Sequence, residues 1–121
     1  MSLDDSVSLD KLQSYKEFFD RQVGRKYPCS NQIVVCGIVT NDRDKAIEFM
    51  KDKKAINVIK SSFQITWELE NGEKWIWCNW NENQRGYRFY KVAIDRYTRS
   101  ELFEFVVGHT CAMYCCSMEI I

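Results

Sequence analysis

The stretch that most constrains the fold is an Asn-Gly pair, Asn71-Gly72, flanked by two runs rich in aromatic and β-branched residues. Asn-Gly is the preferred centre of a two-residue type I′ turn, in which both central residues take positive φ angles. Residues 62–69 and 74–80 are therefore predicted to form an antiparallel hairpin, which must lie in a larger sheet to be stable.

The register of this hairpin follows from the turn. If Asn71 and Gly72 are the two turn residues, Trp67 lies opposite Ile76 on an almost wholly apolar face. Trp75 and Trp77 then lie on the other face, which is otherwise polar. The hairpin is thus expected to have one core face, while Trp75 and Trp77 need a second cover or a ligand.

The remaining elements are predicted from hydrophobic periodicity and from cap residues. Helices are expected over residues 9–23, 41–54 and 98–108, and strands over residues 32–39, 56–59, 91–95 and 110–118. The run at 32–39 is continuously apolar, which is typical of a central strand that is covered on both faces. Apolar strands that alternate with helices predict one α/β domain over residues 1–121, with residues 1–7 loose. Its sheet is expected to be mixed and mostly parallel, extended by the antiparallel Trp-rich hairpin and flanked by helices.

Composition narrows the classes of function. Seventeen basic and 17 acidic residues cancel, so no global field attracts nucleic acid or an anionic membrane. The six cysteines show no C-x-x-C spacing and are expected to be buried thiols in a reducing compartment, which favours a cytoplasmic setting. A structural zinc site assembled from distant cysteines is the alternative. The N-terminus is acidic and polar, and no apolar run is long enough for a membrane span. No cofactor is indicated.

Residues 85–95 consist of Arg-Gly-Tyr followed by a short apolar strand that ends in Asp95. The order of elements up to and including this stretch resembles the ATPase core of phage terminase large subunits. In that family the aspartate belongs to the Walker B motif and a glutamate follows it, whereas Arg96 stands here. The family also needs a Gly-rich loop with Lys-Ser or Lys-Thr that cradles phosphates. No glycine of this chain precedes such a pair. The resemblance therefore implies a degenerate or fragmentary relative of the P-loop ATPases that lacks the Walker A loop, and it implies no hydrolysis.

Several single residues have both a functional and a structural interpretation. Asp95 is a weak candidate for a magnesium ligand, and capping of the loop after its strand is the favoured alternative. His109, near the end of a predicted helix, has no identifiable nucleophile beside it, and packing is favoured. Cys115 and Cys116 have no cationic neighbour in sequence that would lower a thiol pKa, so burial is favoured over reactivity.

The best candidate for a binding surface combines aromatic rings with guanidinium groups, a composition that suits protein interfaces and also stacking on bases. Its members are Trp75, Trp77, Arg85, Tyr87, Arg88 and Tyr90. Three interpretations stay open for the indoles: packing under a helix of the same domain, a protein or self-association interface, and nucleic-acid binding.

The sequence contains no convergent catalytic constellation, so we expect the protein not to be an enzyme. The leading hypothesis is a non-catalytic structural or interaction module that binds a protein partner or a second copy, and a phage-related setting follows only from the resemblance. The alternative is a nucleic-acid-binding module that uses residues 85–88, and the third is a residual nucleotide-binding protein.

Overall fold

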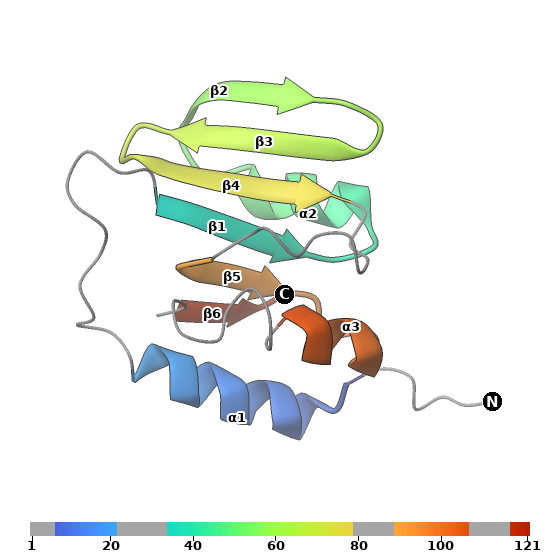
Figure 1. The fold of residues 1–121 in the computed structure, drawn as a ribbon. Helices are drawn as coiled ribbons and strands as arrows, with labels where there is room; N and C mark the ends of the chain where they lie inside the picture. The colour runs from blue at the N-terminus through green and yellow to red at the C-terminus, as the bar shows by residue number, and fades with distance from the viewer. Residues whose placement is uncertain (1–6, 22–33, 79–88, 107–116) are drawn as a thin grey trace.

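The computed structural model describes residues 7–21, 34–78, 89–106 and 117–121 (Figure 1). Three helices and six strands lie in these residues. In chain order they are α1 (Leu9–Asp20), β1 (Val34–Val39), α2 (Arg43–Met50), β2 (Ala55–Lys60), β3 (Gln64–Leu69), β4 (Glu73–Cys78), β5 (Lys91–Ile94), α3 (Ser100–Val106) and β6 (Ser117–Ile120).

The strands form one six-stranded sheet in the order β2-β3-β4-β1-β5-β6. The pairs β4–β1, β1–β5 and β5–β6 are parallel, and β3 runs antiparallel to both β2 and β4. The predicted fold class, a mixed and mostly parallel α/β sheet extended by an antiparallel hairpin, is confirmed. The apolar run that was expected to be central is indeed β1, which pairs on both sides.

Helices cover both faces of the sheet, so the core has two layers, one on each face (Figure 1). Helix α2 packs Ala46 and Met50 on the face that carries Cys36, Ile38 and the indoles of β3 and β4. Helices α1 and α3 pack on the opposite face. The buried residues of that second layer include Leu12, Phe19, Phe89, Val92, Ile94, Phe103 and Met118.

The hairpin forms as predicted, but its register differs by one residue. Trp67 pairs with Trp75, and Ile65 pairs with Trp77, so Trp67 does not lie opposite Ile76. The reason is a longer turn: the Gly72 amide donates to the Leu69 carbonyl at 3.1 Å, and Gly72 alone takes a positive φ of 93°. This matches a three-residue loop that ends in a left-handed glycine rather than the two-residue type I′ turn. The shift places all three indoles on the face that α2 covers.

Some predicted boundaries also need correction. The cap of α2 is Asp42, not Asn41: its carboxylate accepts from the backbone N–H groups of Asp44 and Lys45. Helix α1 ends at Asp20, and the expected continuation to residue 23 lies outside the described residues. The strand expected at 110–118 is described only from Ser117, where β6 begins.

Candidate functional site

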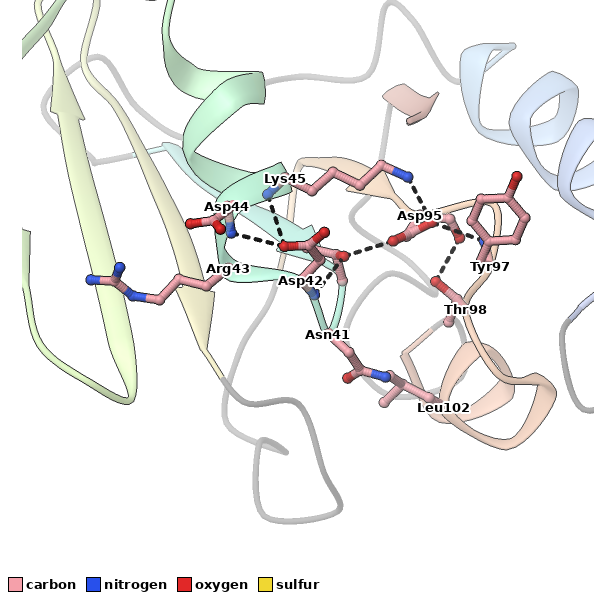
Figure 2. Close-up of a pocket in the computed structure, with 10 residues that line it drawn as sticks. Asn41, Asp42, Arg43, Asp44, Lys45, Asp95, Tyr97, Thr98 and Leu102 are labelled. Carbon is pink, nitrogen blue, oxygen red and sulfur yellow. Dashed lines mark hydrogen bonds and ion pairs between the residues drawn. The ribbon is translucent and has the colours of Figure 1, made fainter.

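A pocket of about 600 Å³ lies at the carboxyl ends of β1 and β5 (Figure 2). Strand β1 leads into α2 on one face of the sheet, whereas the neighbouring β5 leads into α3 on the other face. Adjacent parallel strands whose connections leave in opposite directions form a topological switch point, the usual place for a ligand crevice in an α/β sheet. The pocket is lined by residues 40–45 and by Asp95, Tyr97, Thr98 and Leu102.

Asp95 is the centre of this pocket and is only 7% exposed. Its Oδ2 accepts a hydrogen bond from the Thr40 hydroxyl at 2.7 Å. Its Oδ1 accepts from the Lys45 ammonium and from the Tyr97 backbone N–H, both at 2.9 Å. Burial alone raises the pKa of the Asp95 carboxyl, but these three donors and the Lys45 charge outweigh it, and the pKa lies below its usual value. Asp95 is therefore held as a carboxylate with both oxygens engaged.

Asp42 and Thr98 are occupied in the same way, whereas among the described residues the buried Arg43 Nε has no hydrogen-bond partner. Asp42 Oδ1 accepts from two amides of the first turn of α2, and the Asp42 amide donates to the Thr40 hydroxyl. The Thr98 hydroxyl donates to the Asp95 carbonyl at 2.6 Å. Figure 2 shows the Lys45 side chain reaching towards Asp95, while Arg43 points away from it. The network joins the ends of β1 and β5 to the start of α2, which is the structural role expected for a strand-end aspartate.

The Lys45 ammonium is already paired with a carboxylate, and it lies 5.3 Å from the centre of the Tyr97 ring. Within residues 7–21, 34–78, 89–106 and 117–121, no three histidine, cysteine, aspartate or glutamate side chains are grouped so that they could hold a metal ion. Cys36 and Cys78 are buried and form no disulfide.

The structure separates the residues of the sequence-predicted binding surface. Trp75 and Trp77 are each 2% exposed beneath α2, so the interpretation as core residues holds and their assignment to a candidate surface is corrected. The Trp77 indole N–H donates to the Thr40 carbonyl, and the Trp75 indole N–H donates to Glu73. Tyr90 is half-buried. The other members of that surface, Arg85, Tyr87 and Arg88, lie outside the described residues, as do His109, Cys115 and Cys116.

A second candidate surface was not identified from the sequence. Strand β2 lies at one edge of the sheet, and its apolar side chains are exposed on both faces. Ile56 is 70% exposed, Ile59 59% and Val58 41%, and Phe63 in the following turn is 72% exposed. Large apolar residues that cluster at an open strand edge mark an interaction site more often than scattered ones do. The run at 56–59 was predicted as a strand, but nothing in it indicates an edge position.

The ladder between β2 and β3 determines which backbone groups face outward. The Ser61 amide donates to the Gln64 carbonyl at 2.8 Å, so Ser61 is bonded across to β3. In an antiparallel ladder bonded and non-bonded residues alternate, hence Ile59 and Asn57 also face β3. The amide and carbonyl groups of Val58 and Lys60 therefore point to the open edge. A register shift between Ala55 and Asn57 interrupts this pattern at the start of the strand.

Comparisons with known proteins add no assignment to either surface. The chain matches no protein-family model, and searches of curated proteins and of solved structures found no match. None of the helices in the described ranges is long and apolar enough to cross a membrane.

Proposed function

We propose that this protein is a non-catalytic interaction module and that the open edge of β2 is its contact strand. The observation that carries the proposal is the combination, on one strand, of outward backbone groups at Val58 and Lys60 with apolar side chains exposed on both faces. An added strand would bond to the backbone groups and cover the side chains, which is how β-strand addition gives affinity.

The state of the Asp95 pocket also supports a non-catalytic role. Protein donors use three of the roughly four acceptor sites of the Asp95 carboxylate, which leaves little capacity for a magnesium ion. The resemblance to terminase ATPase cores stays part of the proposal, as do the phage-related and cytoplasmic settings. It rests on sequence pattern, and the missing phosphate loop is consistent with a fold that serves interaction.

Residual nucleotide binding is a second candidate because the pocket lies at a topological switch point. Titration with ATP and magnesium, followed by the melting temperature, tests it, since a ligand that binds only the folded state raises that temperature. A saturable rise that the Asp95→Asn variant loses would favour this candidate. Binding through residues 85–88 to nucleic acid is the remaining alternative, and a steep loss of binding with rising salt is its signature.

The interaction proposal is tested by NMR titration of the ¹⁵N-labelled protein with a neutral strand-forming peptide, acetyl-Gln-Thr-Val-Thr-Val-Thr-Gln-amide, and by sedimentation velocity of the protein alone. We expect saturable shifts of the Val58 and Lys60 amides, or a concentration-dependent dimer. The matched variant is Val58→Pro, which removes an outward donor and leaves the ladder to β3 intact. A protein that stays monomeric and shows no peptide-dependent shift in β2 would refute the proposal.

A further inference from the structure

The charge around β2 indicates which kind of strand fits its edge. Residues 53–67 contain Lys53, Lys54 and Lys60 and no aspartate or glutamate. Lys53 lies over the rings of Phe49 and Trp75, at 4.9 and 5.2 Å from their centres. Lys54 and Lys60 are exposed at the two ends of β2, and no ion pair among the described residues includes them. The carboxylates that border this segment in sequence are Asp52, next to Lys53, and Glu68, which accepts a hydrogen bond from Asn57.

From this distribution we infer that the occupant of the β2 edge is an extended segment of another protein that is apolar in its middle and carries carboxylates at both ends. It would add a seventh strand beside β2 in the six-stranded sheet. The inference rests on the proposed function and specifies its partner. Lys54 and Lys60 lie six positions apart in sequence, and the register shift between Ala55 and Asn57 takes one of these positions out of the ladder. Carboxylates near the two ends of a partner strand of about six or seven residues would therefore come close to these long side chains.

The exposed side chains on the two faces of β2 set the apolar part of the partner. Val58 pairs with Trp67 and so lies on the face that α2 covers, whereas Ile59 pairs with Thr66 and lies on the opposite face. A partner strand with apolar or β-branched residues at successive positions covers both. Neither a lipid surface nor a nucleic acid offers alternating amide and carbonyl groups to Val58 and Lys60, so the backbone geometry favours a peptide strand.

A second copy of this chain fits the edge less well, because of the register shift and the lysines. An antiparallel pair of β2 strands about an axis at Val58 sets Lys60 of each copy opposite Ile56 of the other, where the register shift interrupts the ladder. An axis at Ile59 instead places the two Lys60 side chains diagonally together. Like charges at cross-strand positions are destabilising. The lysines and the register shift near Ile56 thus disfavour self-pairing, and features of this kind commonly protect edge strands. They leave the edge open to a strand of opposite charge.

The experiment compares three peptides of one length by NMR titration. The acidic peptide is acetyl-Glu-Thr-Val-Thr-Val-Thr-Glu-amide, and glutamine or lysine replaces both glutamates in the other two. We expect the acidic peptide to shift the Val58 and Lys60 amides and to bind about tenfold more tightly than the lysine-ended peptide, with the neutral peptide between them. The difference should shrink at about 0.5 M salt, where exposed charges are screened.

Two variants locate the charge effect. In Lys60→Glu the preference for the acidic over the lysine-ended peptide should disappear or reverse. In Arg21→Glu, which makes the same charge change at the end of α1 on the far side of the molecule from β2, it should persist (Figure 1). Of the two alternately N-methylated forms of the acidic peptide, the form that is methylated on the amides facing β2 should no longer bind, because it cannot donate to the Val58 and Lys60 carbonyls.

The outcomes separate this inference from the proposed function. If the neutral or the lysine-ended peptide binds as tightly as the acidic one, or if the protein forms a dimer that Val58→Pro abolishes, the acidic partner is refuted and the interaction module stands. If anionic vesicles or DNA bind at β2 more tightly than the acidic peptide and displace it, the inference of an acidic partner strand is likewise refuted. If no peptide binds and the protein stays monomeric, both fail.

Discussion

The Lys45 ammonium lies 2.9 Å from Asp95 Oδ1 and ties the first turn of α2 to the end of β5. The Asp95 side chain is 10% exposed and that of Lys45 is 29% exposed, so water screens the pair only partly. The same carboxylate also accepts from Thr40 at the end of β1. Asp95 thus connects β1, α2 and β5, which are separate in sequence, so the stability of the fold should depend on its charge.

Replacement of Asp95 by asparagine should destabilise the fold by about 2 kcal/mol, because Lys45 loses its counter-charge in a partly buried position. Urea unfolding followed by tryptophan fluorescence measures the change. The control is Glu48→Gln, which removes the carboxylate of an exposed pair with Lys51 and should cost less than about 0.5 kcal/mol. Equal effects of the two substitutions would show that the Asp95 network contributes no more than a surface pair.

Stability should fall in acid because two carboxyl groups have lowered pKa values in the folded state. Burial raises the pKa of Glu73, but Lys91, the Trp75 indole and Asn71 outweigh it and lower the pKa below 4.5, and that of Asp95 lies below 3.8. The unfolded chain therefore binds protons first as the pH falls. The stabilisation is complete above the ordinary values and is lost as the pH drops through the folded-state values. Unfolding free energies between about pH 6 and pH 2 should decline less steeply in Asp95→Asn than in the wild type.

Gly37→Ala should destabilise the centre of the sheet. A Cβ atom at Gly37 would lie 2.5 Å from the ring of Phe89, which is fully buried. The ring must move within a close-packed layer, which costs about 1 to 3 kcal/mol. Gly37→Ala should lower the free energy of unfolding less in the Phe89→Leu background than it does in the wild type. A purely additive double-variant cycle would contradict the contact.

Gly72→Ala tests the turn of the hairpin by a different mechanism. The φ of Gly72 is 93°, and an added Cβ would meet nothing within 4 Å, so the cost is purely one of backbone conformation. We expect a loss of about 1 kcal/mol in the free energy of unfolding, and a smaller loss in Gly72→Asn, because asparagine tolerates left-handed conformations better. If alanine and asparagine are equally costly, the positive φ does not govern this turn.

Local sequence patterns were enough to predict the class of the fold and the identity of its central strand. The apolar run that became β1 and the alternation of strands with helices are local patterns, and local patterns survive into the folded state. The hairpin was also predicted from a local pattern, but its register depends on whether one or two residues of the turn take positive φ angles. The observed register brings Trp67 to the same face as Trp75 and Trp77, and these two indoles are core residues because β4 is an inner strand beneath α2.

The positions of the candidate sites depend on how the strands assemble into the sheet. Thr40, Lys45 and Asp95 converge because parallel β1 and β5 end side by side, and no spacing in the sequence shows that strand neighbourhood. Strand β2 is exposed because the sheet stops there, and its residues alone would suit an inner strand equally well. Strand order is set by the packing of the whole chain. Burial of apolar surface is non-directional, so no single strand specifies its neighbour, and only the total burial of the chain favours one order of strands.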